Sequence, residues 1–441
     1  MNQSVNQVKQ VYFGVTALTW LSVAIPLPIF VLYMQARGID LFQLGIIMGV
    51  YSIVIVLLEL PTGGLADAIG RKGVALLAHS ISLISGIVML FSFSFAGFLL
   101  AMILNGIGRA LASGTLDAWF VDSLQEAEPG IDLQPALAQA GTVTLLALGT
   151  GTLIGGLLPR FFSALPDEGT ALLTPLSTTL ILSLMLKILL IFAIIFAVKE
   201  KPLVAAGAGN WRSSFSQVPQ IVRESLLISR SNRSILLLMA AALVGGFSLA
   251  GVETFWQPQF ANLLPAGESN NSWIFGLIMA VSFLAGVLGN LFSIPISQRL
   301  GHRHAWVASL ARGGQGLALI LLATQGYIIP ASFGFWLFYL NMGVLNSPHE
   351  TLVNQEIPAS RRSAMLSIQS LASYVGGFLG GILLGFIAQH NSINLAWFVA
   401  GTISMVSLLL YVGVARRRRR GVNINEQKIP VFDYGQEANA G

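Results

Sequence analysis

The most informative stretch of the sequence is ELPTGGLADAIGRK, residues 59–72, which lies between two long apolar segments. Its glycines allow the backbone to turn tightly and to approach a neighbouring helix, because glycine has no Cβ. An anion such as Asp67 is favoured near the N-terminus of a helix. We therefore expect a short charged turn between two helices, suited to hold one conformation of the protein.

The composition of the chain is that of a protein in lipid. Of the 441 residues, 54% are hydrophobic and 10% are charged, whereas soluble domains average about 25% charged residues. About 20 apolar residues in a helix cross ~30 Å of hydrocarbon. Segments of about this length cover 11–34, 41–60, 73–93, 96–124, 134–157, 172–198, 235–260, 273–296, 304–324, 328–353, 364–389 and 393–415. We predict an all-α integral membrane protein with twelve transmembrane helices.

A polar break divides these segments into two groups of six. The predicted parts are an N-terminal bundle (1–198), a cytoplasmic linker (199–234), a C-terminal bundle (235–415) and a basic, then polar, cytoplasmic tail (416–441). If both termini are cytoplasmic, 19 of the 24 Lys and Arg residues lie on the cytoplasmic side. The positive-inside rule therefore predicts a multi-pass protein of the cell (plasma or inner) membrane with both termini in the cytoplasm.

The two halves show a weak internal repeat. When the chain is shifted by about 231 residues, as two parallel repeats would require, Pro26 meets Pro258 and Gly70 meets Gly301. We expect two similar bundles around a central cavity.

The turn at 59–72 follows a recognisable order of residues, namely Gly, three residues, Asp, two residues, Gly and then bases. The residues in these positions are Gly63, Asp67, Gly70, Arg71 and Lys72. This pattern resembles the cytoplasmic loop signature of the major facilitator superfamily, and the six-plus-six plan of the chain is similar to that of the multidrug and small-solute branch. The resemblance implies that Asp67 and Arg71 engage an acid low on helix 4 when the protein faces outward, and Asp122 lies in that place. Alternatively, Arg71 and Lys72 only anchor the loop at the lipid headgroups.

Ionisable residues within the spans need an explanation, because a charge at the centre of a helix costs about 2.5–3.5 kcal/mol on insertion. Arg109 resembles the helix 4 arginine of proton-coupled members of the superfamily. On a continuous helix, Asp117 would lie about 80° round from Arg109, so that both would face one wet cavity. Alternatively, Arg109 and an acid only neutralise each other. Lys187 and Arg312 are expected to snorkel to the membrane surface.

Span 7 contains Glu253, Trp256 and Gln257 next to Pro258. A carboxylate, an indole and an amide beside a helix-breaking proline predict a face that binds solute, with a break at membrane depth. Alternatively, Trp256 belongs to the aromatic belt at the membrane surface.

Span 10 contains Asn341, His349 and Glu350. Because histidine titrates near neutrality, His349 and Glu350 are a candidate proton site. Alternatively, they form a polar helix end. Glu59 is either a carboxylate of the solute pathway or a partner of the loop cations.

Several classes of function are excluded or disfavoured. The chain has no cysteine and contains neither a phosphate-binding glycine loop nor a His-Glu-x-x-His motif. We therefore predict no cofactor, no metal and no enzyme activity. Because the basic residues are scattered between apolar spans, we expect no nucleic-acid partner. The expected partners are a small-molecule solute, protons as coupling ion and the lipid bilayer, and the protein is expected to be a monomer.

The leading hypothesis is a secondary transporter that exports a small hydrophobic or amphipathic solute by proton-coupled alternating access. The residues 149–156, GTGTLIGG, are similar to the helix 5 signature of drug antiporters but lack its proline after Gly151, which weakens the case for drug export. Alternatives are facilitated uptake or exchange of a nutrient or lipid-like solute, a membrane sensor that does not transport, and an intramembrane enzyme.

Overall fold

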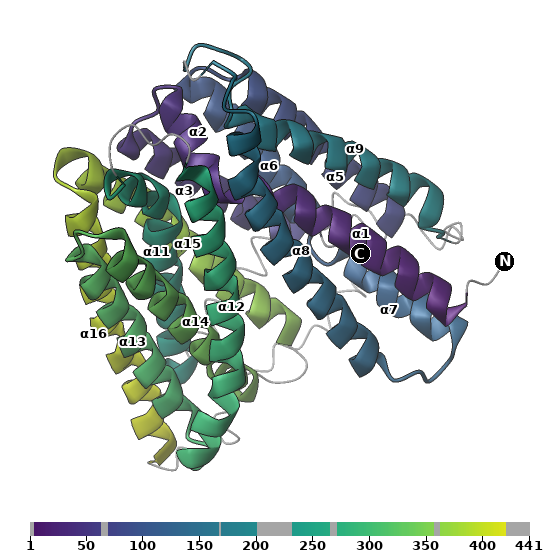
Figure 1. Ribbon diagram of the computed structural model, residues 1–441. Helices are drawn as coiled ribbons and strands as arrows, with labels where there is room; N and C mark the ends of the chain where they lie inside the picture. Colours follow the sequence, from purple (N-terminus) through teal and green to yellow (C-terminus); the bar gives the residue numbers. More distant parts are fainter. Residues whose placement is uncertain are drawn as a thin grey trace, which may run out of the picture.

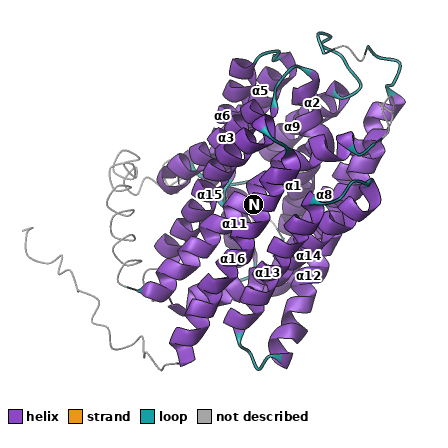
Figure 2. Ribbon diagram, turned by 90° about the vertical axis from the view of Figure 1, so that its left-hand side faces the viewer, coloured by secondary structure: helices purple, strands orange, loops and turns teal. Residues whose placement is uncertain are grey.

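The protein is described by a computed structural model that covers residues 4–62, 69–166, 169–200, 232–264, 271–356 and 362–419. Within these ranges the chain is helical and contains no strand (Figure 2). Twelve of the described helical stretches are long and apolar enough to cross a membrane. The prediction of a twelve-span all-α membrane protein is therefore confirmed.

The first half of the chain supplies six of these spans, two of which consist of more than one helix. Its elements are α1 (Val5–Ala24), η1 (Leu27–Ile29), α2 (Phe30–Ala36), α3 (Leu41–Thr62), α5 (Arg71–Phe91), α6 (Phe95–Ala112), α7 (Thr115–Ala127), α8 (Leu133–Phe161) and α9 (Ser177–Ala197).

The second half supplies the other six spans, each as one helix. Its elements are α11 (Arg233–Asn262), α12 (Ser272–Arg299), α13 (His304–Ala323), α14 (Ile328–Glu356), α15 (Arg362–His390) and α16 (Ile393–Arg419). Thus α16 extends beyond the predicted end of span 12 at 415 and includes the first arginines of the basic run.

The positions of the helix breaks differ from those expected. The predicted break at Pro258 is wrong, because α11 continues through this residue to Asn262. Span 1 is broken instead at Pro26 and Pro28, two residues that lack a backbone N–H. Span 4 is broken at Gly114, whose φ of +69° is readily adopted by glycine.

The two halves meet through α3 against α15 and through α8 against α12. Figure 1 shows them together near α2 and diverging toward the ends where α1 begins and α16 stops. We call the latter end the terminus side and the end near α2 the opposite side. Glycines bring the helices close at both contacts, since a Cβ on Gly381 would touch Gly45 and a Cβ on Gly276 would touch Gly156.

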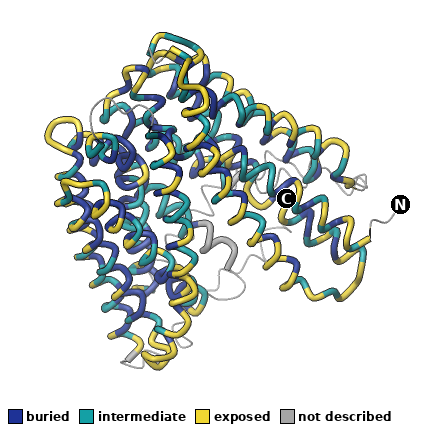
Figure 3. Tube along the Cα trace, viewed as in Figure 1, coloured by how far each residue is buried: buried dark blue, intermediate teal, exposed yellow. Residues whose placement is uncertain are grey.

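Exposed residues lie along the outer sides of the helices (Figure 3), and many of them are large and apolar, as a lipid-facing surface requires. Examples of exposed side chains are Leu57, Leu146, Phe196, Ile329 and Val406.

Candidate functional site

Polar side chains from both halves gather between the two bundles. We define the central cluster as Tyr51 and Glu59 of α3, Arg109 of α6, Glu253 of α11 and Tyr374 of α15. Arg109 and Glu253 are exposed although the residues next to each of them along the chain are buried. Each charge therefore stands out between two buried neighbours.

Within the first half, Glu59 and Arg109 balance each other. The carboxylate of Glu59 accepts a hydrogen bond from Ser113 and interacts electrostatically with Arg109. Arg109 also interacts with Tyr51 and, across the contact between the halves, with Tyr374. Glu59 therefore lies within reach of Arg109 and Ser113 of span 4.

Glu253 differs from Glu59 in its neighbours. It lies within electrostatic range of three tyrosines, Tyr51, Tyr339 and Tyr374. Among the described residues it forms no ion pair. A carboxylate that lacks a cation inside a membrane protein is costly unless it takes up a proton or a cationic ligand.

Asp117 and Arg109 belong to different helices of span 4. The break at Ser113 and Gly114 ends α6 and starts α7, so the two residues do not share one continuous helix. Asp117 instead accepts a hydrogen bond from the hydroxyl of Tyr12, whose ring stacks on Phe120 with 3.9 Å between centroids. The expected angle between Arg109 and Asp117 is therefore wrong, because it assumed an unbroken span.

The residues predicted in span 7 separate into three environments. Glu253 joins the central cluster, whereas Trp256 is 1% exposed and packs against Phe260 and other aromatic rings of the second half. This position fits neither a solute face nor an aromatic belt. Gln257 is also buried, and its amide bonds to span 1 of the other half.

The residues predicted in span 10 form hydrogen bonds with partners outside the central cluster. His349 is buried with Nδ1 2.9 Å from the hydroxyl of Tyr411, and Glu350 accepts a hydrogen bond of 2.6 Å from Gln369. Asn341 donates to the Leu337 carbonyl of its own helix. His349 and Glu350 thus have separate partners.

The charged turn between α3 and α5 is described from Ile69 onward, and Gly63 and Asp67 lie outside the described residues. Arg71 forms an ion pair of 2.5 Å with Asp122. The pair is present in an arrangement in which the halves diverge on the terminus side.

Glu200 is a partner that the sequence reasoning missed. Its carboxylate accepts hydrogen bonds from the backbone N–H groups of Arg71, at 2.8 Å, and of Lys72, at 3.0 Å. It therefore caps the N-terminus of α5, where an anion is favoured. The side chain of Lys72 bonds to the carbonyls of Ile195 and Val198, both at 2.7 Å.

The expected snorkelling of Lys187 and Arg312 is wrong. Both side chains are buried, because each finds polar partners inside its bundle. Lys187 donates to the hydroxyl of Ser82 at 2.8 Å, and Arg312 donates to the carbonyl of Ala241 at 3.0 Å.

Comparison with known proteins places this geometry in context. The family model described as Major Facilitator Superfamily matches residues 12–269 and 269–433. The chain is 23% identical to an uncharacterised MFS-type transporter, YxaM, of Bacillus subtilis (strain 168), over 95% of this chain and 98% of that protein.

Solved structures of transporters have a similar fold. The nucleoside transporter NupG is 16% identical, with a TM-score of 0.75 over 92% of this chain and 98% of that one. The peptide transporter POT in complex with alafosfalin is 14% identical, with a TM-score of 0.72 over 93% of this chain and 95% of that one.

Proposed function

Because this chain belongs to the Major Facilitator Superfamily and is a multi-pass membrane transporter rather than an enzyme, we propose that it exports a small hydrophobic or amphipathic solute in exchange for protons. The observation that carries this proposal is the central cluster. There Glu253 of the second half lies in electrostatic range of Tyr51 and Tyr374, which also interact with Arg109 of the first half.

The charges of the central cluster suggest how a proton drives the exchange. The negative charge of Glu59 neutralises the positive charge of Arg109. The net charge of the cluster is therefore the one negative charge of Glu253. A proton on Glu253 makes the cluster neutral and lets the halves rock while solute is absent. Loss of the proton leaves a carboxylate among tyrosine rings, an environment that suits a neutral or cationic solute.

We further propose that both termini are cytoplasmic and that the protein acts as a monomer in the cell membrane. The positive-inside rule supports this orientation, because the sequence segments that it would place in the cytoplasm contain 19 of the 24 Lys and Arg residues. The described arrangement is then the inward-facing one. Arg71, Lys72 and Asp122, with Gly63, Asp67 and Gly70, are proposed to form the conformational latch of the first half.

The test is solute transport by purified protein in proteoliposomes with an imposed pH gradient. The solute panel contains cationic, neutral and sugar-like compounds, and the variants are Glu253→Gln and, as control, Glu128→Gln, an exposed acid at the end of α7. We expect flux that depends on the gradient in the wild type and the control, and its loss in Glu253→Gln.

Other outcomes would overturn the proposal. Flux that does not respond to the gradient would identify a facilitator of uptake or exchange. Gradient-driven flux that survives in Glu253→Gln would remove this carboxylate from coupling, and an absence of flux with every solute would favour a sensor.

A further inference from the structure

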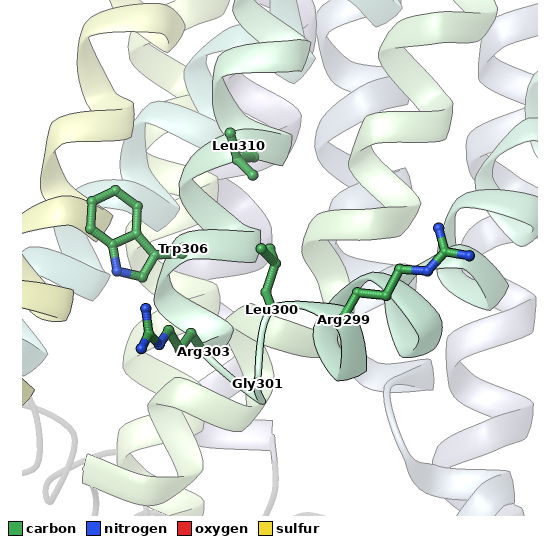
Figure 4. Close-up of a pocket in the computed structure, with 6 residues that line it drawn as sticks. All are labelled: Arg299, Leu300, Gly301, Arg303, Trp306 and Leu310. Carbon is green, nitrogen blue, oxygen red and sulfur yellow. The ribbon is translucent and has the colours of Figure 1, made fainter.

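An open pocket lies on the terminus side of the second half, away from the central cluster, where α12 ends at Arg299 and α13 begins at His304. The residues that line it are Arg299, Leu300, Gly301, Arg303, Trp306 and Leu310. Figure 4 shows Arg303 and Trp306 on one side of Leu300 and Arg299 on the other. The lining therefore contains two cations and no acid.

The two arginines of the pocket have no acidic partner in the part of the chain that the structure describes. Both side chains are exposed, and among the described residues neither forms an ion pair. Two other arginines on this side do have acidic partners, since Arg71 pairs with Asp122 and Arg418 pairs with Glu356 at 2.8 Å. The pocket thus offers an anion two arginines without an acidic partner, one on each side of Leu300.

The turn that shapes the pocket is held to the end of α12. The backbone N–H of His302 donates to the Ser297 carbonyl at 2.8 Å, and the hydroxyl of Ser297 lies 3.1 Å from Nδ1 of His304. Gly301 has φ +63°, a conformation that glycine adopts readily. The arginines therefore project from a formed turn.

The lining of the pocket changes from polar to apolar along α13, from the end of the helix toward its middle, as a bilayer does from its headgroups to its acyl chains. The arginines lie at the ends of two membrane-spanning helices. Trp306 lies in the first turn of α13, and Leu310, which is 64% exposed, lies about one turn further along the helix. Arginine and tryptophan are typical of the headgroup level, and exposed leucine is typical of the acyl chains. A soluble anion would use only the arginines.

We propose that this pocket binds an anionic phospholipid, with its phosphate between Arg299 and Arg303 and an acyl chain along Leu310. Basic pockets between helices at the membrane surface provide this kind of lipid recognition. The proposal does not depend on the transported solute or on proton coupling.

The test is a titration of delipidated, detergent-purified protein with phosphatidylglycerol, followed by native mass spectrometry. The variant Arg299→Gln/Arg303→Gln is compared with Arg233→Gln/Arg416→Gln, which removes the same charge from exposed arginines at the terminus-side ends of α11 and α16. We expect the first pair to raise the Kd of the first bound phosphatidylglycerol about tenfold and the second pair to leave it within about twofold. Equal losses in both double variants would mean diffuse surface charge and would overturn the proposal.

Two further arms identify the ligand and its position. Phosphatidylcholine should bind equally to the wild type and to both variants, and glycerol phosphate should not compete; effective competition would overturn a lipid site. Brominated phosphatidylglycerol should quench the tryptophan fluorescence of the wild type more than that of Trp306→Phe, whereas equal quenching would place the lipid elsewhere. Unchanged thermal unfolding of the variants shows that they fold.

Discussion

The side-chain amide of Gln257 replaces a hydrogen bond that span 1 loses between Leu27 and Val31. In an unbroken helix the N–H of Val31 would donate to the carbonyl of Leu27. Here Oε1 of Gln257 accepts from Val31 at 2.9 Å and Nε2 donates to Leu27 at 2.9 Å. Because Gln257 belongs to the second half, the break in span 1 joins the two halves on the opposite side.

Replacing Gln257 should therefore open the opposite side. Gln257→Ala leaves buried backbone groups of span 1 without partners, each at a cost of about 1–3 kcal/mol, and the halves can separate to let water reach them. The control is Gln259→Ala, because Gln259 bonds to Asn394 within the second half.

The measurement uses the absence of native cysteine. Spin labels are attached at Ser163→Cys and Tyr327→Cys, in the loops that follow α8 and α13. Electron paramagnetic resonance then measures the distance between the two halves. Gln257→Ala should raise the ratio of long to short distances about tenfold or more. An unchanged distribution would show that the amide does not hold this side closed.

The contact between α8 and α12 gives a second way to open the same side. A Cβ on Gly276 would lie 2.6 Å from the Thr152 carbonyl oxygen and 2.9 Å from Cα of Gly156, so Gly276→Ala must push the halves apart. In the same helix, a Cβ on Gly286 would meet only the Tyr339 carbonyl at 3.8 Å. The distance between the same two spin labels should increase in Gly276→Ala and remain unchanged in Gly286→Ala.

The start of α5 should be sensitive to one glycine and tolerant of another. Gly70 has φ +81°, and a Cβ there would lie 2.8 Å from Oε2 of Glu200. Gly70→Ala should therefore lower the free energy of unfolding by about 1–3 kcal/mol. Gly73→Ala, inside the helix, should raise it by up to about 1 kcal/mol, because its Cβ meets only Ile69 at 3.6 Å or more.

Thermal unfolding in detergent measures this difference. A Tm for Gly70→Ala equal to that of the wild type would show that the hydrogen bonds of Glu200 to α5 do not require a glycine at position 70. Glu200→Gln should lower the Tm as well, since it removes the negative charge at the N-terminus of α5.

The sequence predicted the number of spans and their grouping because these depend on apolar length and on the distribution of charge. It did not predict which proline or glycine breaks a helix. Pro258 is kept inside α11, whereas Pro26 and Pro28 end α1, where Gln257 satisfies the freed backbone groups. Such a compensation comes from the other half of the chain and has no signal in local periodicity.

The same limit explains the missed partners in the site. Glu200 lies 129 residues from Arg71 in the sequence, and nothing in a single sequence pairs them. Tyr51, Tyr339 and Tyr374 were not selected either. Tyrosine has an apolar ring and a polar tip, so it is common both in apolar spans and in binding sites, and its presence does not distinguish the two. The carboxylates Glu59 and Glu253 and the cation Arg109 were selected as candidates, since charge within a span is itself a signal.

A double-mutant cycle distinguishes the two arrangements of Arg109. The structure joins Arg109 to Glu59 electrostatically and gives Asp117 to Tyr12. Arg109→Gln combined with Glu59→Gln should therefore be non-additive by about 0.5–3 kcal/mol in the free energy of unfolding. Arg109→Gln combined with Asp117→Asn should be additive within about 0.5 kcal/mol.

Reversible unfolding in mixed detergent, measured for the wild type, the three single variants and the two double variants, gives both coupling energies. Strong coupling between Arg109 and Asp117 would mean that span 4 forms one continuous helix in which the two charges face one cavity. The break at Gly114 would then be absent from the folded protein, and Tyr12 would lose its partner. Coupling to Glu59 alone requires the break, because only then does the acid of α7 turn toward α1 while the arginine of α6 stays in the central cluster.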